Sequence, residues 1–140
     1  MANSWHTYPS IYNLGHSAVK DLFSVPVNIE EKVDGSQFSF CVEEDGEVKV
    51  RSKGAVMIPD APERMFASAV STVKSLRSRA HPGWTYRCEF LAKPKHNTLA
   101  YDRIPDQHLI VFDINTGNES YLPYAEKADE ARRIGWHKYT

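Results

Sequence analysis

The chain has 140 residues, enough for one domain whose hydrophobic core needs neither disulfides nor a structural metal. Its hydrophobic content of 41%, charged content of 25% and aromatic content of 11% are those of a globular protein, and they exclude a disordered or fibrous chain. The net charge of −1 gives no overall attraction to nucleic acid or to an anionic membrane, so any phosphate-binding surface must be local.

The first half of the chain is expected to open with a short helix over Gly15–Phe23 and a strand over Val25–Val33. Residues 36–43 then alternate with period two, which predicts a half-buried strand. One face of that strand would carry Phe38, Phe40 and Val42, and the other would carry Gln37, Ser39 and Cys41. A tight turn at Asp45-Gly46 completes a predicted β-hairpin over Gln37–Ser52.

The second half is expected to contain a long amphipathic helix over Pro59–Ala80, two strands over Trp84–Ala92 and His108–Ile114, and a last helix over Tyr124–Ile134. The apolar positions of the long helix are Met65, Phe66, Ala69, Val70, Val73 and Leu76. Hairpin-joined strands with irregularly interspersed helices predict an α+β fold, built as one domain over residues 1–140 on antiparallel sheets with flanking helices.

Cys41 and Cys88 lie in apolar, strand-like segments without metal-ligand spacing, so we interpret both as reduced core thiols of a cytosolic protein. No apolar run of the sequence approaches the ~18 residues that a membrane span needs. The first ten residues, MANSWHTYPS, lack the pattern of a secretory signal. We therefore expect a soluble protein without a membrane partner, located in the cytoplasm, or in the host cytoplasm if the chain is viral.

The stretch EKVDGSQFSF contains the residues best suited to covalent chemistry. A lysine with an ordinary pKa of about 10.4 is almost entirely protonated at pH 7, so a nucleophilic lysine needs a site with organised partners. On a strand, Lys32 and Asp34 would share a face, and Gly35 would let another chain or a ligand approach the backbone closely. The alternative is an edge-strand lysine that pairs with its acidic neighbours ahead of a turn.

Four segments in order resemble the N-terminal part of an ATP-dependent, phage-type RNA ligase, in the covalent nucleotidyltransferase superfamily shared with DNA ligases and capping enzymes. They are EKVDGSQFSF with Lys32, VRSKG with Arg51, YRCEFLAKP with Glu89, and LIVFDI with Phe112 and Asp113. The resemblance implies the nucleotidyltransferase adenylation fold, which is ATP-grasp-like. It also implies that Lys32 attacks the α-phosphate of ATP to form lysyl-AMP, which is then used to join RNA ends.

The resemblance also implies roles for the other matching residues. Arg51 would contact the nucleotide or the RNA end, and Phe112 would stack on the adenine. Glu89 would read the nucleotide sugar or help to hold Mg²⁺ or Mn²⁺. Glu31, directly before the lysine, corresponds to the glutamate that reads the base, although strand alternation would place Glu30 on the face of Lys32.

Nucleic-acid contacts are expected at Gln37, Lys53 and Lys95. DNA ligases and capping enzymes usually carry arginine where this chain has Gln37, so an amide there favours RNA ligase. A basic track along a phosphate backbone could include Lys53, Lys93, Lys95, His96 and Arg103. The alternative for these side chains is an ordinary solvated loop.

Two later elements of the family are absent from the sequence: a Glu-Gly strand and a Lys-x-Lys strand that binds the α-phosphate. The only Lys-x-Lys, Lys93-Pro94-Lys95, lies upstream of Phe112. We therefore expect a domain incomplete at its C-terminus, arising from truncation, from a split gene completed by a second chain, or from decay. On its own the chain is expected to bind ATP weakly and to self-adenylylate poorly or not at all. The alternatives are a non-catalytic nucleotide- or RNA-binding module and a DNA ligase- or capping-type enzyme.

Overall fold

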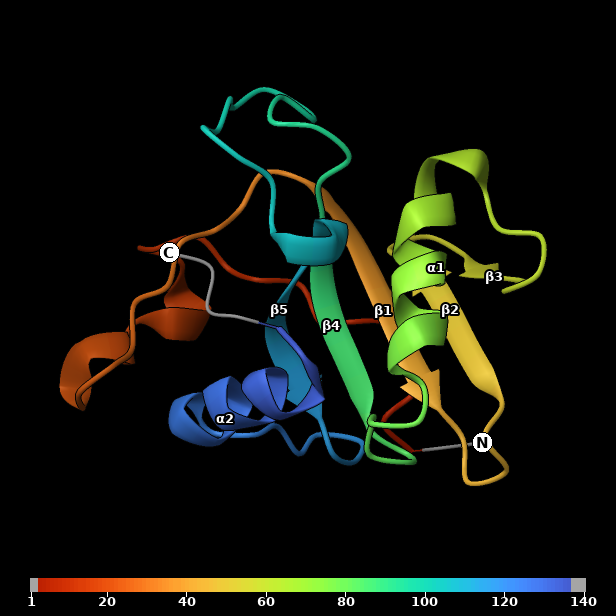
Figure 1. Ribbon diagram of the computed structural model, residues 1–140. Helices are drawn as coiled ribbons and strands as arrows, with labels where there is room; N and C mark the ends of the chain where they lie inside the picture. The colour runs from red at the N-terminus through yellow and green to blue at the C-terminus, as the bar shows by residue number, and fades with distance from the viewer. Residues whose placement is uncertain (1–2, 137–140) are drawn as a thin grey trace.

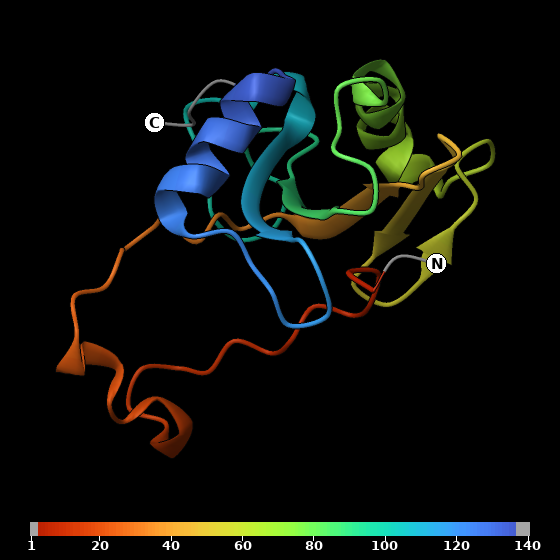
Figure 2. The same cartoon turned by 90° about the horizontal axis from the view of Figure 1, so that it is seen from below.

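Five antiparallel strands form a single sheet in the order β3-β2-β1-β4-β5, as the computed structural model of residues 3–136 shows (Figure 1). The strands are β1 (Ser36–Val42), β2 (Val48–Ser52), β3 (Val56–Met57), β4 (Thr85–Phe90) and β5 (Leu109–Asn115). The two α-helices, α1 (Ala67–Leu76) and α2 (Tyr124–Ile134), lie on the same side of this sheet (Figure 2). The predicted α+β class, with antiparallel pairing and flanking helices, is confirmed.

The β1–β2 hairpin forms where the alternating sequence predicts it. Gly46 has a φ of +84° in the connecting turn, and its N–H donates to the carbonyl of Glu43. Phe38, Phe40 and Val42 enter the core beneath the helices. The predicted strands in the second half correspond to β4 and β5.

The helix predicted over Pro59–Ala80 is shorter than expected. A 3-10 turn, η3 (Arg64–Phe66), leads into α1, which ends at Leu76. Proline at 59 and 62 disfavours helical backbone in the residue before it, so the helix begins only after both prolines. Met65 is 48% exposed, whereas the other five predicted apolar positions are buried.

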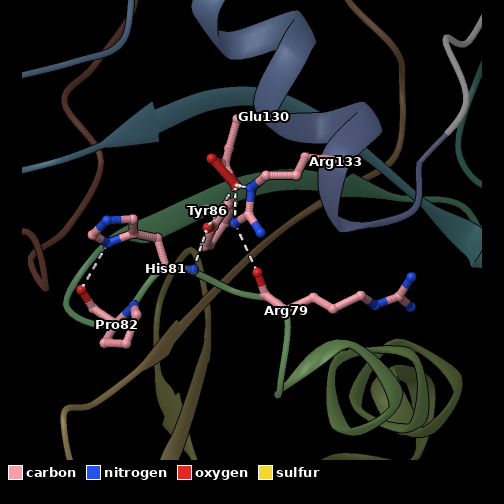
Figure 3. A network of polar contacts seen from close by, with 6 residues as sticks. All are labelled: Arg79, His81, Pro82, Tyr86, Glu130 and Arg133. Carbon is pink, nitrogen blue, oxygen red and sulfur yellow. Dashed lines mark hydrogen bonds and ion pairs between the residues drawn. The ribbon is translucent and has the colours of Figure 1, made fainter.

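Helix α2 has the predicted bounds and ends at Gly135, whose φ of +120° suits glycine. A polar network joins α2 to β4 and to the segment that connects α1 to β4 (Figure 3). The Tyr86 hydroxyl accepts a hydrogen bond from the His81 N–H at 2.8 Å and donates to Glu130 of α2. Arg133 of α2 donates to the carbonyl of Arg79 in that segment at 2.7 Å, so α2 is held by both the strand and the connection before it.

The N-terminal third departs most from prediction. Instead of a helix over Gly15–Phe23 there are two 3-10 turns, η1 (Ser17–Val19) and η2 (Leu22–Ser24). The side chains expected to face the core, Ala18, Leu22 and Phe23, are exposed.

The strand predicted over Val25–Val33 does not form either. Both neighbouring places beside β1 are taken by β2 and β4, and Pro26 lacks a ladder donor. Lys32 and Asp34 therefore do not share a strand face; they lie in an irregular segment that leads into β1.

The second face of the sheet is covered by residues 4–8, which we call the N-terminal strap (Figure 2). The Ser4 hydroxyl donates to the carbonyl of Gly83 at 2.7 Å and lies 2.8 Å from the Thr85 hydroxyl. Under the strap, Ser39 is 1% exposed and Cys41 is fully buried. The prediction of a half-buried strand is therefore wrong for Phe38–Val42, which is buried on both faces.

Cys41 and Cys88 are free and buried, as the sequence predicts for reduced core thiols. A last 3-10 turn, η4 (Asp106–His108), precedes β5. Within residues 3–136, no helix is both long and apolar enough to cross a bilayer.

Candidate active site

Lys32 is exposed and lies in the irregular segment that leads into β1, between the exposed Glu31 and the buried Val33. We refer to residues 30–34, which belong to no helix or strand, as the Lys32 turn. Asp34 fixes this turn to the loop that follows β4. Its carboxylate accepts hydrogen bonds from the backbone N–H groups of Thr98 at 2.9 Å and Leu99 at 2.8 Å. These bonds, the Leu99 N–H first, lower the pKa of Asp34, and the positive charge of Lys32 adds to the effect.

Gly35, directly before β1, lies very close to the backbone of β4. A Cβ at this position would lie 2.3 Å from the carbonyl oxygen of Phe90 and 3.1 Å from Cγ of Glu89. The Gly35 N–H donates to Oε2 of Glu89 at 3.1 Å. The close approach expected at Gly35 is thus made by the backbone of β4, and it sets Glu89 beside the Lys32 turn.

Glu89 is a half-buried carboxylate on the strap side of the sheet, with Gln37 opposite it in the β1–β4 register. Burial raises the pKa of Glu89, while the Gly35 hydrogen bond and the charge of Lys32 oppose that rise. Lys32 and Glu89 are therefore close enough to interact electrostatically. The structure brings together Lys32, Asp34, Gly35, Gln37 and Glu89.

Phe112 sits at an irregularity in the β4–β5 ladder. The register shifts between Arg87, which pairs with Asp113, and Cys88, which pairs with Val111, and Phe112 falls between these pairs. Such bulges re-aim a side chain. The ring of Phe112 meets the ring of Tyr8 edge-on at 5.2 Å, and the Tyr8 hydroxyl donates to the Asp113 carboxylate at 2.6 Å. The strap therefore contacts the ring expected to stack on adenine.

Arg51 is also held by the strap. It pairs with Ser39 in the β1–β2 register, and its guanidinium donates to the Thr7 hydroxyl at 3.2 Å. The guanidinium carbon lies 5.8 Å from the centroid of the Trp5 ring. In this arrangement Arg51 points toward the strap.

Arg87 was not anticipated from the sequence. It is fully buried beneath the strap and donates to the Asn115 side chain at 2.9 Å, the Ser39 hydroxyl at 3.2 Å and the Ser4 carbonyl at 3.1 Å. Burial lowers the pKa of Arg87. The sequence feature that could have identified Arg87 is its position two residues before Glu89, because residues two apart on a strand share a face.

Glu30 and Glu31 line the same cavity, and the strand alternation that favoured Glu30 does not apply. This cavity of about 400 Å³ lies between residues 29–33, residues 103–106 and α2. Glu30 additionally forms an ion pair with Lys127 of α2, at 2.5 Å. The described residues that line this cavity do not include Phe112, so the two residues expected to recognise the base do not share it.

The basic side chains of the predicted phosphate-binding track are spread over separate loops. Lys53, Lys93, Lys95 and Arg103 are exposed on two loops. His96 instead bonds the Ser36 hydroxyl at 2.8 Å and the Ala92 N–H at 3.2 Å, which holds the loop after β4 against β1.

Residues 3–136 contain no cluster of three or more His, Cys, Asp or Glu side chains that could hold a metal ion. Mg²⁺ commonly binds through one or two carboxylates together with substrate phosphates. Glu89 fits that mode, because its second oxygen is not used by the Gly35 hydrogen bond.

Comparison with known protein families gives one match: the family model for RNA ligase covers residues 25–139. The chain therefore belongs to the RNA ligase family, which confirms the resemblance seen in the sequence and supports a ligase-like function. The matched region includes the Lys32 turn, Glu89 and Phe112, and it begins after the strap. A search of curated proteins found no match.

Proposed function

We propose that this chain is an ATP-dependent nucleotidyltransferase of RNA end joining, in which Lys32 becomes adenylylated. One observation carries the proposal: within the RNA ligase region, the exposed Lys32 is followed by Asp34, which is bonded to the Thr98 and Leu99 N–H groups, and by Gly35, which is bonded to the half-buried Glu89. A fixed turn limits the positions that the nucleophile can take, which lowers the entropic part of the barrier.

The proposed step is a displacement at phosphorus. The neutral amine of Lys32 donates its electron pair to the α-phosphorus of ATP, and a nitrogen–phosphorus bond forms. The bond between the α-phosphorus and the oxygen bridging to the β-phosphate breaks, and pyrophosphate leaves with that electron pair. The nitrogen then releases a proton to water, so that lysyl-AMP, pyrophosphate and a proton are the products.

The neighbouring residues have distinct proposed roles. Glu31 and Phe112 recognise the base, Glu89 orients the sugar or a metal, and Arg51 binds a phosphate after leaving Thr7. Bound Mg²⁺ or Mn²⁺ would neutralise charge on the phosphates. Gln37, Lys53 and Lys95 contact the RNA, whose ends are the second substrate.

A second candidate function is a nucleotide- or RNA-binding module without the covalent step. The strap favours it, because Trp5 and Thr7 contact Arg51 while Tyr8 contacts Phe112. Arg51 and Phe112, which are proposed to bind the nucleotide, are thereby in contact with the strap. A partner chain or segment that completes the phosphate site would convert such a module into an enzyme.

The experiment is incubation with α-labelled ATP and magnesium, followed by denaturing electrophoresis. We expect a weak covalent label in the wild-type chain, because the later phosphate-binding strands are missing from it, and no label in Lys32→Ala or in the charge-preserving Lys32→Arg. A label that survives Lys32→Ala refutes the assignment of the nucleophile. Labelling by GTP alone would favour a capping-type enzyme, and salt-dependent RNA binding without any label would favour the module.

A further inference from the structure

We infer that Lys127, on α2, is a positioning residue that holds the Lys32 turn and Phe112 in a fixed relation to each other. The inference rests on the proposed function. The Lys127 side chain is only 10% exposed. Its ammonium lies 2.5 Å from Oε1 of Glu30 and donates to the carbonyl of Phe112 at 2.9 Å. One group thus joins the segment before Lys32 to the strand that carries Phe112.

The Lys32 turn needs such an anchor because it lacks regular pairing. Residues 25–35 belong to no helix or strand. Asp34, two residues after Lys32, is fixed by the loop following β4. Glu30, two residues before it, is fixed by Lys127. Lys32 therefore lies between two anchors, and removing either one would free one side of the turn.

The contact with Phe112 gives Lys127 a second effect. The carbonyl of Phe112 belongs to the residue that falls between the shifted β4–β5 pairs. Lys127 supplies that carbonyl with a donor and so stabilises the irregularity that orients the ring. The ammonium also lies 5.5 Å from the centroid of the Tyr124 ring, which restricts it on a third side.

A lysine is rarely this buried unless it is paired, and an uncharged residue would pack at such a position without desolvating a charge. Lys74 of α1 differs, because it is 48% exposed and pairs with Asp60. Lys74 therefore provides a matched control, since it is a lysine with an ion pair and does not line the cavity that Glu31 lines.

The test compares Lys127→Met, Lys127→Arg and Lys74→Met in two measurements on the full chain. The first is the rate of Lys32 labelling across ATP concentrations. We expect Lys127→Met to lower the rate at saturating ATP by about tenfold to a hundredfold, as misplacement of reacting groups does. Lys127→Arg should restore most of the rate, because Arg can donate to both Glu30 and Phe112, and Lys74→Met should match the wild type.

The second measurement does not require activity: the heteronuclear ¹⁵N NOE of the backbone amides of residues 30–34. We expect these values to fall in Lys127→Met, with the values in β1 unchanged, and to remain high in Lys127→Arg. Wild-type values in Lys127→Met would overturn the inference, whatever the labelling rate. If the wild type shows no label, the proposed function fails, and the NOE comparison alone decides whether Lys127 orders the turn.

Discussion

Gly35 offers the most direct test of how β1 and β4 meet. In Gly35→Ala the new Cβ would lie 2.3 Å from the Phe90 carbonyl oxygen, about 1 Å closer than an ordinary contact allows. The obstacle is backbone, so the two strands must separate next to the Ser36–Phe90 pair. Overpacking of this kind costs about 1–3 kcal/mol. We expect a value near the upper limit, about 3 kcal/mol, because no flexible side chain can move aside.

Thermal unfolding followed by circular dichroism measures this effect. For a chain of this length, about 3 kcal/mol corresponds to a fall in Tm of roughly 10 °C. Gly54→Ala is the matched control, since a Cβ there meets nothing within 4 Å and Gly54 has no left-handed backbone. Its stability should change by less than about 0.5 kcal/mol. Equal Tm values for the two variants would refute the close approach at Gly35.

Two further substitutions test the Asp34 anchor and the buried Arg87. The lowered pKa of Asp34 means that its contribution is present above pH ~4 and is lost as the pH falls through the lowered value. Asp34→Asn should therefore be less stable than the wild type at pH 7, and the Tm difference should shrink in acid; a constant difference would contradict the assignment. Arg87→Met leaves buried acceptors on Ser4, Ser39 and Asn115 without their donor and should cost about 2–4 kcal/mol in urea unfolding. An unchanged urea midpoint would mean that these contacts are not made in solution.

Local patterns predicted the regular parts of the fold. The Asp45-Gly46 turn with alternating flanks indicated the β1–β2 hairpin, and the last helix was expected at about Tyr124–Ile134, where α2 lies. The predictions that failed concern segments whose conformation or burial depends on tertiary contacts. Val25–Val33 has a strand-like composition, but the places beside β1 are already filled. The burial of Ser39 and Cys41 depends on the strap, which lies far away in the sequence and carries no period-two pattern.

The candidate site likewise contains features that the sequence predicted and residues that it did not. The close backbone approach expected at Gly35 is present, whereas the strand face that Lys32 and Asp34 were expected to share does not form. Arg87 and Lys127 were missed because their importance comes from burial and from partners more than 80 residues away in the chain. A single sequence shows that a residue is charged, but it does not show which distant residue forms an ion pair or hydrogen bond with it.

The two cysteines lie in different layers of the molecule. Cys41 is next to Thr85 beneath the N-terminal strap, whereas Cys88 belongs to the core that the helices cover. Burial raises the pKa of the Cys41 thiol to about 11 and also raises that of Cys88, so neither reacts readily in the closed protein. The protein thus contains two native chemical reporters: modification of Cys41 before Cys88 would record the strap lifting while the helical layer stays closed.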